Sequence, residues 1–319
     1  MVLVYIDQAD QQIKKASLEA LSYGAAIAKH LGIATEALVL GTVQEDLTNL
    51  GQYGASKVHH LKNELLNSLD VKVHSTLIAE AAKKLNATVL VFAQNLNGRA
   101  IAPAVAVKLE AGIVTGACSL PNTSNGFEVT KTVFSGKAFA HIKIETPIKI
   151  IAINQNSFGL VEFNTSATIE NIDLAIPTPS IKITKVEKIE GEIPLTEANL
   201  VVSGGRGLKG PENWGILLDL AKALGAATAC SRPVSDSDWR PHHEHVGQTG
   251  IQIAPNLYIA IGISGAIQHL AGVNRSKTIV VINKDPEAPF FKAADYGVVG
   301  DAFDIVPKLT AAVLKAKEN

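Results

Sequence analysis

Short apolar runs alternate with helical patterns over the first 120 residues of the chain. The apolar runs are Leu3–Ile6, Ala37–Leu40, Val89–Phe92 and Ile113–Val114. Between them, apolar residues recur at the three-to-four-residue spacing of a helix that buries one face, and the first such helix ends at Gly32. Strands that alternate with helices in this way predict βαβ units and a parallel sheet covered on both faces.

The pattern changes over residues 126–154, where three β-rich segments follow one another. They are Glu128–Val133, Ala138–Ile144 and Ile148–Ile153, with a turn at Ser135-Gly136 between the first two. We expect all three to be antiparallel strands added to the first domain.

A polar segment then leads to a second alternating unit. Residues 155–198 contain three prolines and a charged stretch, so we place a linker near residues 185–198. This predicts an N-terminal α/β domain over residues 1–190 and a C-terminal domain over residues 195–319. The expected strands of the second domain are Leu200–Val202, Ala226–Cys230, Leu257–Gly262, Thr278–Ile282 and Gly297–Val299, with helices at residues 211–224, from Ser264 and at residues 304–317. The fold class is therefore α/β with two parallel-sheet domains, the second doubly wound.

Composition narrows the class of protein without naming a function. Of the 319 residues, 47% are hydrophobic and 18% charged, which is enough apolar material for two cores. The 29 basic residues do not exceed the 30 acidic ones, so we expect no nucleic-acid partner. Cys118 and Cys230 stand far apart without a CxxC pair, which argues against a disulfide framework, structural zinc or an iron–sulfur cluster. No apolar run approaches the roughly 20 residues that span a bilayer, so we expect a soluble, intracellular chain.

Glycine-rich or polar loops follow the strands of the second domain. In Ser203–Gly210 a strand runs into four glycines, among them Gly205, Gly207 and Gly210, and into Arg206, and a predicted helix follows, an arrangement that favours an anion. The glycines fit GxGxxG, but the NAD-binding pattern needs an acid at the end of the next strand, which here ends at Ser231-Arg232. The loop indicates a phosphate or ribityl contact through Arg206 rather than a standard NAD site, with an ordinary glycine-rich connection as the alternative.

Two further loops carry groups suited to a ligand. Val246–Gly250 sets an amide and a hydroxyl between two glycines, which suits a loop whose backbone approaches a planar molecule. Ser264-Gly265 is expected to cap a helix that carries Gln268 and His269 in its first turns. The alternative for His269 is a core histidine whose hydrogen bonds are satisfied within the protein. Because the carboxyl ends of parallel strands meet at one edge of a sheet, these loops predict a cleft large enough for a dinucleotide. The remaining polar strand ends are Asn283–Asp285 and Gly300-Asp301.

The sequence contains no motif that indicates a metal site or a catalytic site for a substrate. The adjacent histidines of His242–His245 lack the i, i+4 spacing of a metal site, so we interpret them as loop residues. No Ser-His-Asp or Cys-His arrangement and no nucleophile elbow stands out.

Together these motifs closely resemble the α subunit of electron-transfer flavoproteins. The order and spacing agree throughout residues 200–319, and Gly262–His269 is the most specific part. The first domain is compatible with the less distinctive N-terminal domain of that family. The segments that carry the resemblance are Val202–Leu208, Ser231-Arg232, Val246–Gly250, Tyr258–Gly272 and Asn283–Pro289.

The resemblance implies one FAD in the C-terminal domain and a heterodimer in which the N-terminal domain contacts a β subunit. It also implies an electron carrier rather than an enzyme, one that accepts electrons from dehydrogenases such as the acyl-CoA dehydrogenases of fatty acid β-oxidation. The acceptor would be a membrane quinone reductase, and the location the cytoplasm, or the mitochondrial matrix in a eukaryote.

The same resemblance assigns roles to individual residues. It places Arg232 over the flavin ring, Thr249 and His269 at the edge of the isoalloxazine, and Asn283 and Asp301 at the adenosine end. The full set of residues implied to surround FAD is Arg206, Ser231, Arg232, Val246, Gly247, Gln248, Thr249, Ser264, Gly265, Ala266, Ile267, Gln268, His269, Asn283 and Asp301.

Three alternative functions remain open at this point. A flavin-dependent oxidoreductase with its own substrate would need a titratable residue in the pocket. A nucleotide-binding regulatory module would bind its ligand without redox activity. An electron-bifurcating flavoprotein would hold a second FAD in the β subunit.

Overall fold

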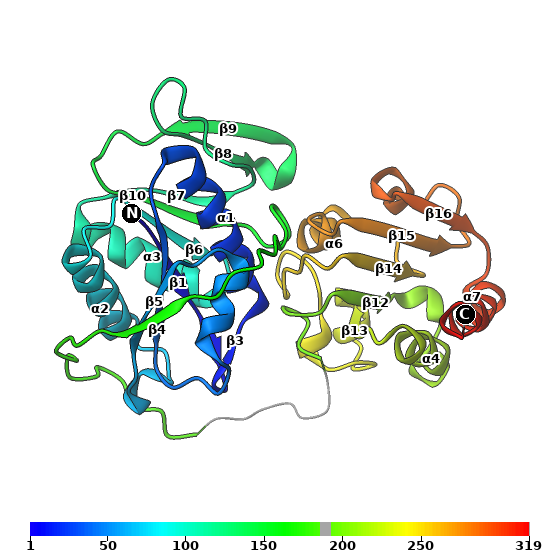
Figure 1. The fold of residues 1–319 in the computed structure, drawn as a ribbon. Helices are drawn as coiled ribbons and strands as arrows, with labels where there is room; N and C mark the ends of the chain where they lie inside the picture. Colours follow the sequence, from blue (N-terminus) through cyan, green and yellow to red (C-terminus); the bar gives the residue numbers. More distant parts are fainter. Residues whose placement is uncertain (186–192, 319) are drawn as a thin grey trace. The chain divides into compact units, whose positions relative to one another are not determined.

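The computed structural model describes residues 1–185 and 193–318, and the chain divides into two units, residues 1–187 and 188–319. Each unit is an α/β domain built around a largely parallel sheet (Figure 1). Half of the predicted linker, residues 186–192, lies outside the described residues.

The first unit contains a nine-stranded sheet in which seven neighbouring strands run parallel and the last two form an antiparallel hairpin. A separate two-stranded hairpin, β2 (Gln8–Ala9) and β3 (Gln12–Ile13), follows the first strand. In spatial order the nine strands are β11 (Thr168–Asn171), β5 (Lys57–Leu61), β4 (Thr35–Leu40), β1 (Val2–Ile6), β6 (Val89–Ala93), β10 (Lys149–Ile153), β7 (Gly112–Ala117), β8 (Glu128–Val133) and β9 (Ala138–Lys143).

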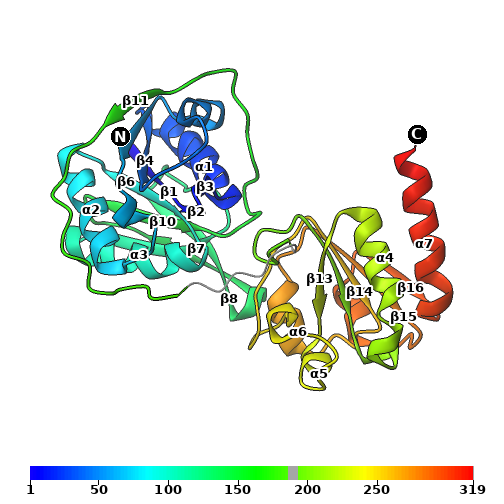
Figure 2. The same cartoon turned by 90° about the horizontal axis from the view of Figure 1, so that it is seen from below.

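Helices cover both faces of this sheet, as predicted. Helix α1 (Lys15–Leu31) packs on one face, and α2 (Val71–Lys84) and α3 (Leu96–Leu109) pack on the other (Figure 2). Successive side chains of β1 enter different cores, because side chains of a strand point alternately to its two faces. Val4 therefore packs with α1, whereas Tyr5 packs with α2 and α3.

The prediction for β10 was wrong in direction. The strand is not part of an antiparallel extension but lies parallel between β6 and β7, inside the sheet. Four of its five residues are buried, the continuous apolar pattern of a strand covered on both faces. By contrast, β8 and β9 are antiparallel as predicted, and β9 alternates between half-buried and exposed residues.

The sequence prediction also missed β5 and β11. Strand β5 is polar in sequence, yet its His60 is buried and hydrogen-bonded by Nε2 to the carbonyl oxygen of Gly41, at 2.8 Å. Strand β11 is exposed along its whole length and pairs in parallel with β5 at the edge of the sheet. Neither strand shows the apolar pattern by which a strand is recognised.

The second unit is a five-stranded, fully parallel, doubly wound sheet, as predicted. Helices α4 (Gly215–Leu224) and α7 (Ala302–Lys317) cover one face. The short helix α6 (Ile267–Val273) belongs to the other face, and α5 (Arg232–Ser235) follows the second strand. In spatial order the strands are β13 (Ala227–Cys230), β12 (Leu200–Gly204), β14 (Leu257–Ile261), β15 (Thr278–Asn283) and β16 (Tyr296–Val299).

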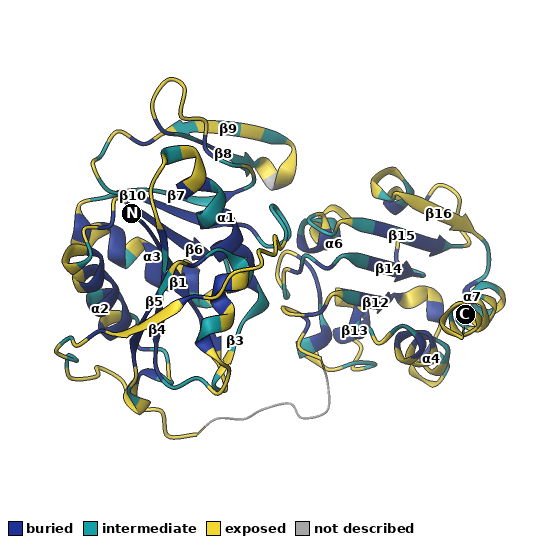
Figure 3. Cartoon of the chain, viewed as in Figure 1, coloured by how far each residue is buried: buried dark blue, intermediate teal, exposed yellow. Residues whose placement is uncertain are grey.

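Burial separates the centre of this sheet from its edge (Figure 3). Four of the five residues of β12 and of β14 are buried, whereas all four residues of the edge strand β16 are exposed. Among the described residues, no helix is both long enough and apolar enough to cross a membrane.

Candidate functional site

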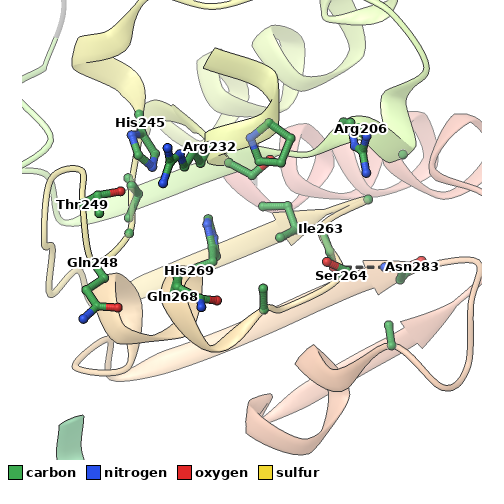
Figure 4. Close-up of a pocket in the computed structure, with 18 of the residues that line it drawn as sticks. Arg206, Arg232, His245, Gln248, Thr249, Ile263, Ser264, Gln268, His269 and Asn283 are labelled. Atoms are coloured by element: carbon green, nitrogen blue, oxygen red, sulfur yellow. Dashed lines mark hydrogen bonds between the residues drawn. The ribbon is translucent and has the colours of Figure 1, made fainter. Parts of the chain in front are cut away.

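A cavity of about 490 Å³ opens at the carboxyl ends of the strands of the second unit (Figure 4). Its volume lies within the usual range of ligand pockets, about 300–1,000 Å³. The chain passes from β12 to β13 on one side and returns to β14 on the other, so the loops after β12 and β14 meet at a topological switch point, where open α/β sheets bind ligands. The lining residues are Arg206, Gly207, Ser231, Arg232, Pro233, His245, Val246, Gly247, Gln248, Thr249, Gly262, Ile263, Ser264, Ala266, Gln268, His269, Asn283, Asp285 and Ala288.

The glycines after β12 serve a contact between two loops. The N–H of Gly205 donates to the carbonyl oxygen of Ile261 at 2.9 Å, and the N–H of Gly207 donates to that of Gly262 at 3.0 Å. A Cβ on Gly205 would stand 2.3 Å from the carbonyl oxygen of Gly262. Close backbone approach therefore explains these glycines, and the loop presents the side chain of Arg206 to the cavity.

Neither predicted helix start has the expected position. The helix expected from residue 211 begins at Gly215, after a 3₁₀ turn at Pro211–Asn213, so four residues separate the end of the glycine loop from the helix. The helix expected at Ser264 begins at Ile267, because Gly265 adopts φ +85° and packs against Phe290. We therefore assign anion binding after β12 to the charge of Arg206 and not to the dipole of a helix.

Two guanidinium groups supply positive charge to the cavity wall, and they lie apart along it (Figure 4). Arg206 stands in a 3₁₀ turn after β12, and Arg232 is the first residue of α5 after β13. The Nε of Arg232 donates to Asp236 at 3.2 Å, but both side chains are largely exposed, so this pair contributes little stability in water. Both arginines therefore remain at the surface of the cavity, where an anionic ligand would meet them.

The loop that carries Gln248 and Thr249 is anchored on α6. The N–H of Gln248 donates to the carbonyl oxygen of Gln268 at 2.7 Å. Both side chains are exposed, and Figure 4 shows them on the same side of the cavity as His245. An amide and a hydroxyl on an anchored backbone can hydrogen-bond the edge of a ligand.

His269 forms a buried, uncharged part of the wall. It is 7% exposed, and its Nε2 lies 2.8 Å from the hydroxyl oxygen of Tyr258. Burial lowers the pKa of His269 to about 4, and the charge of nearby His245 acts in the same direction. The imidazole is therefore neutral at physiological pH.

Two predicted residues, Asn283 and Asp301, make structural hydrogen bonds. The side-chain Nδ2 of Asn283 donates to the carbonyl oxygen of Ile263 at 3.0 Å, which links the ends of β14 and β15 (Figure 4). The carboxylate of Asp301 caps α7 by accepting the N–H of Phe303 at 3.0 Å. Asn283 lines the cavity and Asp301 does not.

Of the fifteen residues predicted from the sequence, twelve line this one cavity. The three that do not are Gly265, Ile267 and Asp301. Four of the seven residues that the prediction missed, Gly207, Pro233, His245 and Ile263, are direct chain neighbours of predicted ones, so a window of one residue on each side would have found them. Gly262 and Asp285 lie two residues from the nearest predicted residue, and Ala288 is brought to the cavity only by the fold. The missed residues are Gly207, Pro233, His245, Gly262, Ile263, Asp285 and Ala288.

The histidines of His242–His245 have different positions. His242 accepts or donates a hydrogen bond with Ser235 at 2.7 Å in a short 3₁₀ helix, whereas His245 lines the cavity. The interpretation of His245 as an ordinary loop residue therefore missed its position. Within the described residues, no group of three or more His, Cys, Asp or Glu side chains is arranged to hold a metal ion.

Comparison with known proteins agrees with this geometry. The family model of the electron transfer flavoprotein FAD-binding domain matches residues 194–274, which contain most of the cavity wall. The family model of the electron transfer flavoprotein domain matches residues 2–177, which span most of the first unit.

Three curated relatives match nearly the whole chain. The electron transfer flavoprotein subunit alpha of Bacillus subtilis is 36% identical, covering 97% of this chain and 96% of the relative. That of Thermoanaerobacterium thermosaccharolyticum is 34% identical, covering 99% and 98%. A chain of Caenorhabditis elegans with the name probable electron transfer flavoprotein subunit alpha, mitochondrial, is 36% identical, covering 98% and 93%. With family models and full-length relatives in agreement, the chain belongs to the α-subunit family of electron transfer flavoproteins, and its second unit is the family's FAD-binding domain.

Proposed function

We propose that this chain carries electrons by holding one FAD in the cavity of its second unit, as the α subunit of a heterodimer with a β subunit. The observation that carries the proposal is the cavity at the switch point, with two separated guanidinium groups and one neutral, buried imidazole in its wall. An FAD needs charge for its pyrophosphate and polar groups for the edge of its ring, and the residues present fit both needs.

Each residue has a role that follows from its chemistry. Arg206 would hold the pyrophosphate, since a guanidinium can form two parallel hydrogen bonds with a phosphate. Arg232 would place a permanent positive charge beside the isoalloxazine ring. Thr249 and Gln248 would hydrogen-bond the ring edge from the loop that Gln268 anchors. When bound, FAD supplies the capacity to accept and release electrons, and the protein tunes that capacity through charge and hydrogen bonds.

Two titratable groups of the cavity, His269 and Asp285, are poorly suited to act on a substrate, which favours a carrier over an enzyme with its own substrate. His269 is neutral and already hydrogen-bonded to Tyr258, so it is poorly placed to exchange a proton with a substrate. Asp285 is exposed, and its carboxylate accepts the N–H of Glu287 at 3.0 Å. A general acid or base works best with a pKa near the operating pH and direct access to the reacting atom.

The electron donors that we propose are dehydrogenases, among them acyl-CoA dehydrogenases, and the acceptor is a membrane quinone reductase. Membership of the family supports a soluble carrier between such partners, in the cytoplasm of a bacterium. In a eukaryote the place would be the mitochondrial matrix, in line with the name of the Caenorhabditis elegans relative. The apolar residues Phe134 and Phe139 of the first unit, 80% and 64% exposed, support a contact of that unit with the β subunit.

The test is purification of the heterodimer followed by analysis of its cofactor and its electron transfer. We expect one FAD per heterodimer in this cavity, reduced by a dehydrogenase and reoxidised by a quinone reductase. A well-folded complex that releases NADP or no nucleotide would contradict the proposal. Two FAD per heterodimer would favour electron bifurcation, and turnover of a substrate by the isolated chain would favour an enzyme.

A further inference from the structure

A buried hydrogen bond lies directly behind the wall of the cavity. Tyr258 is a fully buried residue of β14, and its hydroxyl oxygen lies 2.8 Å from Nε2 of His269 on α6. His269 lines the cavity and Tyr258 does not. In the sequence, Tyr258 is one apolar residue of a strand, with no role at the site.

Both partners are uncharged at physiological pH. Burial lowers the pKa of His269 to about 4, and burial raises the pKa of Tyr258 well above its usual value. A neutral imidazole carries a proton on only one of its nitrogens. The phenol therefore either donates to Nε2, with the ring proton on Nδ1, or accepts from a protonated Nε2.

The surroundings of the pair decide between these arrangements. The backbone of Val246 interacts with the His269 ring in a way that favours its protonation. The N–H of Val246 already donates to the carbonyl oxygen of Cys230, so the interacting group is the carbonyl of Val246. Because Nε2 faces Tyr258, we infer that Nδ1 is the nitrogen nearer to that carbonyl. Nδ1 is buried and has no partner of ordinary hydrogen-bond geometry among the described residues, so without a proton it would leave a bare lone pair there.

The phenol proton gives the same answer. If Nε2 donated to Tyr258, the phenol would need another acceptor for its own proton. The Ser203 hydroxyl is close enough to lower the pKa of Tyr258, but its Oγ makes no hydrogen bond of ordinary geometry with any described residue. The arrangement with fewer unsatisfied groups is donation from Tyr258 to Nε2.

We propose that Tyr258 is a positioning residue for His269, because its hydroxyl donates to Nε2 of the imidazole. This hydrogen bond keeps the ring neutral and places the ring proton on Nδ1, toward the carbonyl of Val246. It thereby fixes the part of the cavity wall that faces the bound cofactor. The link joins β14, behind the wall, to α6 and to the loop that begins at Val246, both of which line the cavity. It rests on the proposed function, because its consequence is tighter binding of FAD in that cavity.

The test is Tyr258→Phe in the full-length chain, purified with its β subunit. The matched control is Tyr23→Phe, because Tyr23 is an equally buried phenol that donates to the carbonyl oxygen of Ser119 at 2.8 Å in the first unit. We expect Tyr258→Phe to raise the dissociation constant of FAD about threefold to tenfold, the loss of one ordinary hydrogen bond, and the control to leave it unchanged.

A second measurement reads the position of the proton directly. In ¹⁵N-histidine-labelled heterodimer, the His269 signals, identified by their loss in His269→Gln, should show a protonated Nδ1 and a bare Nε2. In Tyr258→Phe the two nitrogens should move toward a mixture of the two forms, and the pKa of the ring should rise because the donor to Nε2 is gone.

The outcomes separate the two proposals. A proton on Nε2 in the wild-type protein, or unchanged nitrogen signals together with unchanged FAD affinity in Tyr258→Phe, would overturn the positioning role. Absence of FAD from the wild-type heterodimer would overturn the proposed function instead, while the histidine signals would still decide the role of Tyr258. If Tyr258→Phe does not fold, a fluorotyrosine at this position keeps the aromatic ring and makes the hydroxyl a stronger hydrogen-bond donor. The pKa of His269 should then fall, and an unchanged pKa would overturn the positioning role of Tyr258.

Discussion

At the scale of single residues, Arg232 is the group expected to tune the cofactor most strongly. Reduction adds negative charge to a flavin, so a guanidinium beside the ring stabilises the reduced form. Arg232→Ala should lower the reduction potential of the bound flavin by an amount equivalent to about 1.5–3 kcal/mol, the worth of a hydrogen bond to a charged group. Redox titration of the heterodimer measures this shift, and FAD should remain bound through Arg206 and the loops.

Two further variants control for charge and shape. Arg232→Lys should restore part of the potential, because lysine carries the charge without the planar fork. Asp236→Asn removes the carboxylate that pairs with Arg232 and should leave the potential unchanged or raise it. If Arg232→Ala retains FAD and its potential is that of the wild type, then Arg232 is a surface charge and the ring lies elsewhere.

His269 should make the stability of the protein depend on pH. The unfolded chain binds a proton at this residue near pH 6.5, whereas the folded chain does so only near pH 4. Stability is therefore fully present above pH 6.5 and is lost as the pH falls toward 4, by roughly 2–4 kcal/mol from this residue. Denaturant unfolding of the wild type and of His269→Gln at pH 6.5 and at pH 4 measures this loss of stability. A loss of equal size in both proteins would show that His269 is not its cause.

At the scale of elements, the contact between the loops after β12 and β14 should be intolerant of any side chain. A Cβ on Gly205 would collide with the backbone of Gly262, which cannot move aside as a side chain can. Gly205→Ala should therefore lower the free energy of unfolding by about 1–3 kcal/mol. Gly215→Ala is the matched control, because a Cβ at that position would have open space within 4 Å, and stability there should be unchanged or slightly higher. Equal effects of the two substitutions in denaturant titrations would argue against this loop contact.

Glu19 ties the segment after β10 to helix α1. Its buried carboxylate accepts three backbone N–H groups, those of Asn156, Phe158 and Gly159, at 2.8–2.9 Å. Glu19→Gln replaces one acceptor oxygen by a donor that faces these N–H groups, so we expect a loss of about 1.5–3 kcal/mol in unfolding free energy. The exposed Glu80 of α2 provides the control Glu80→Gln, which should change little; similar losses in both variants would show that Glu19 is not an anchor.

Sequence patterns predicted helices and strands well where the apolar residues recur with the spacing of the helix or strand, and poorly elsewhere. The apolar strands around the cavity were recognisable, and parallel strands bring their carboxyl ends to one edge, so the pattern predicted the position of the cleft. The individual site residues came from the family resemblance. The pairing of β10 depends on distant strands, and adjacency in sequence to β8 and β9 suggested the wrong partners. Strand β5 was missed because burial of His60 is satisfied by a tertiary hydrogen bond that no local pattern encodes.

At the scale of the whole molecule, we propose different roles for the two units. The second unit holds the cavity, while the first carries exposed apolar residues at the β8–β9 hairpin, where a β subunit would find an apolar contact. We therefore expect the isolated chain to bind FAD more weakly than the heterodimer does.

The central claim is that FAD occupies the cavity at the carboxyl ends of β12, β13, β14 and β15. An experimental structure of the purified heterodimer tests it most directly. We predict density for FAD with its pyrophosphate at Arg206 and its isoalloxazine between Arg232 and His269. A heterodimer that contains FAD elsewhere, with this cavity filled only by water, would contradict the claim.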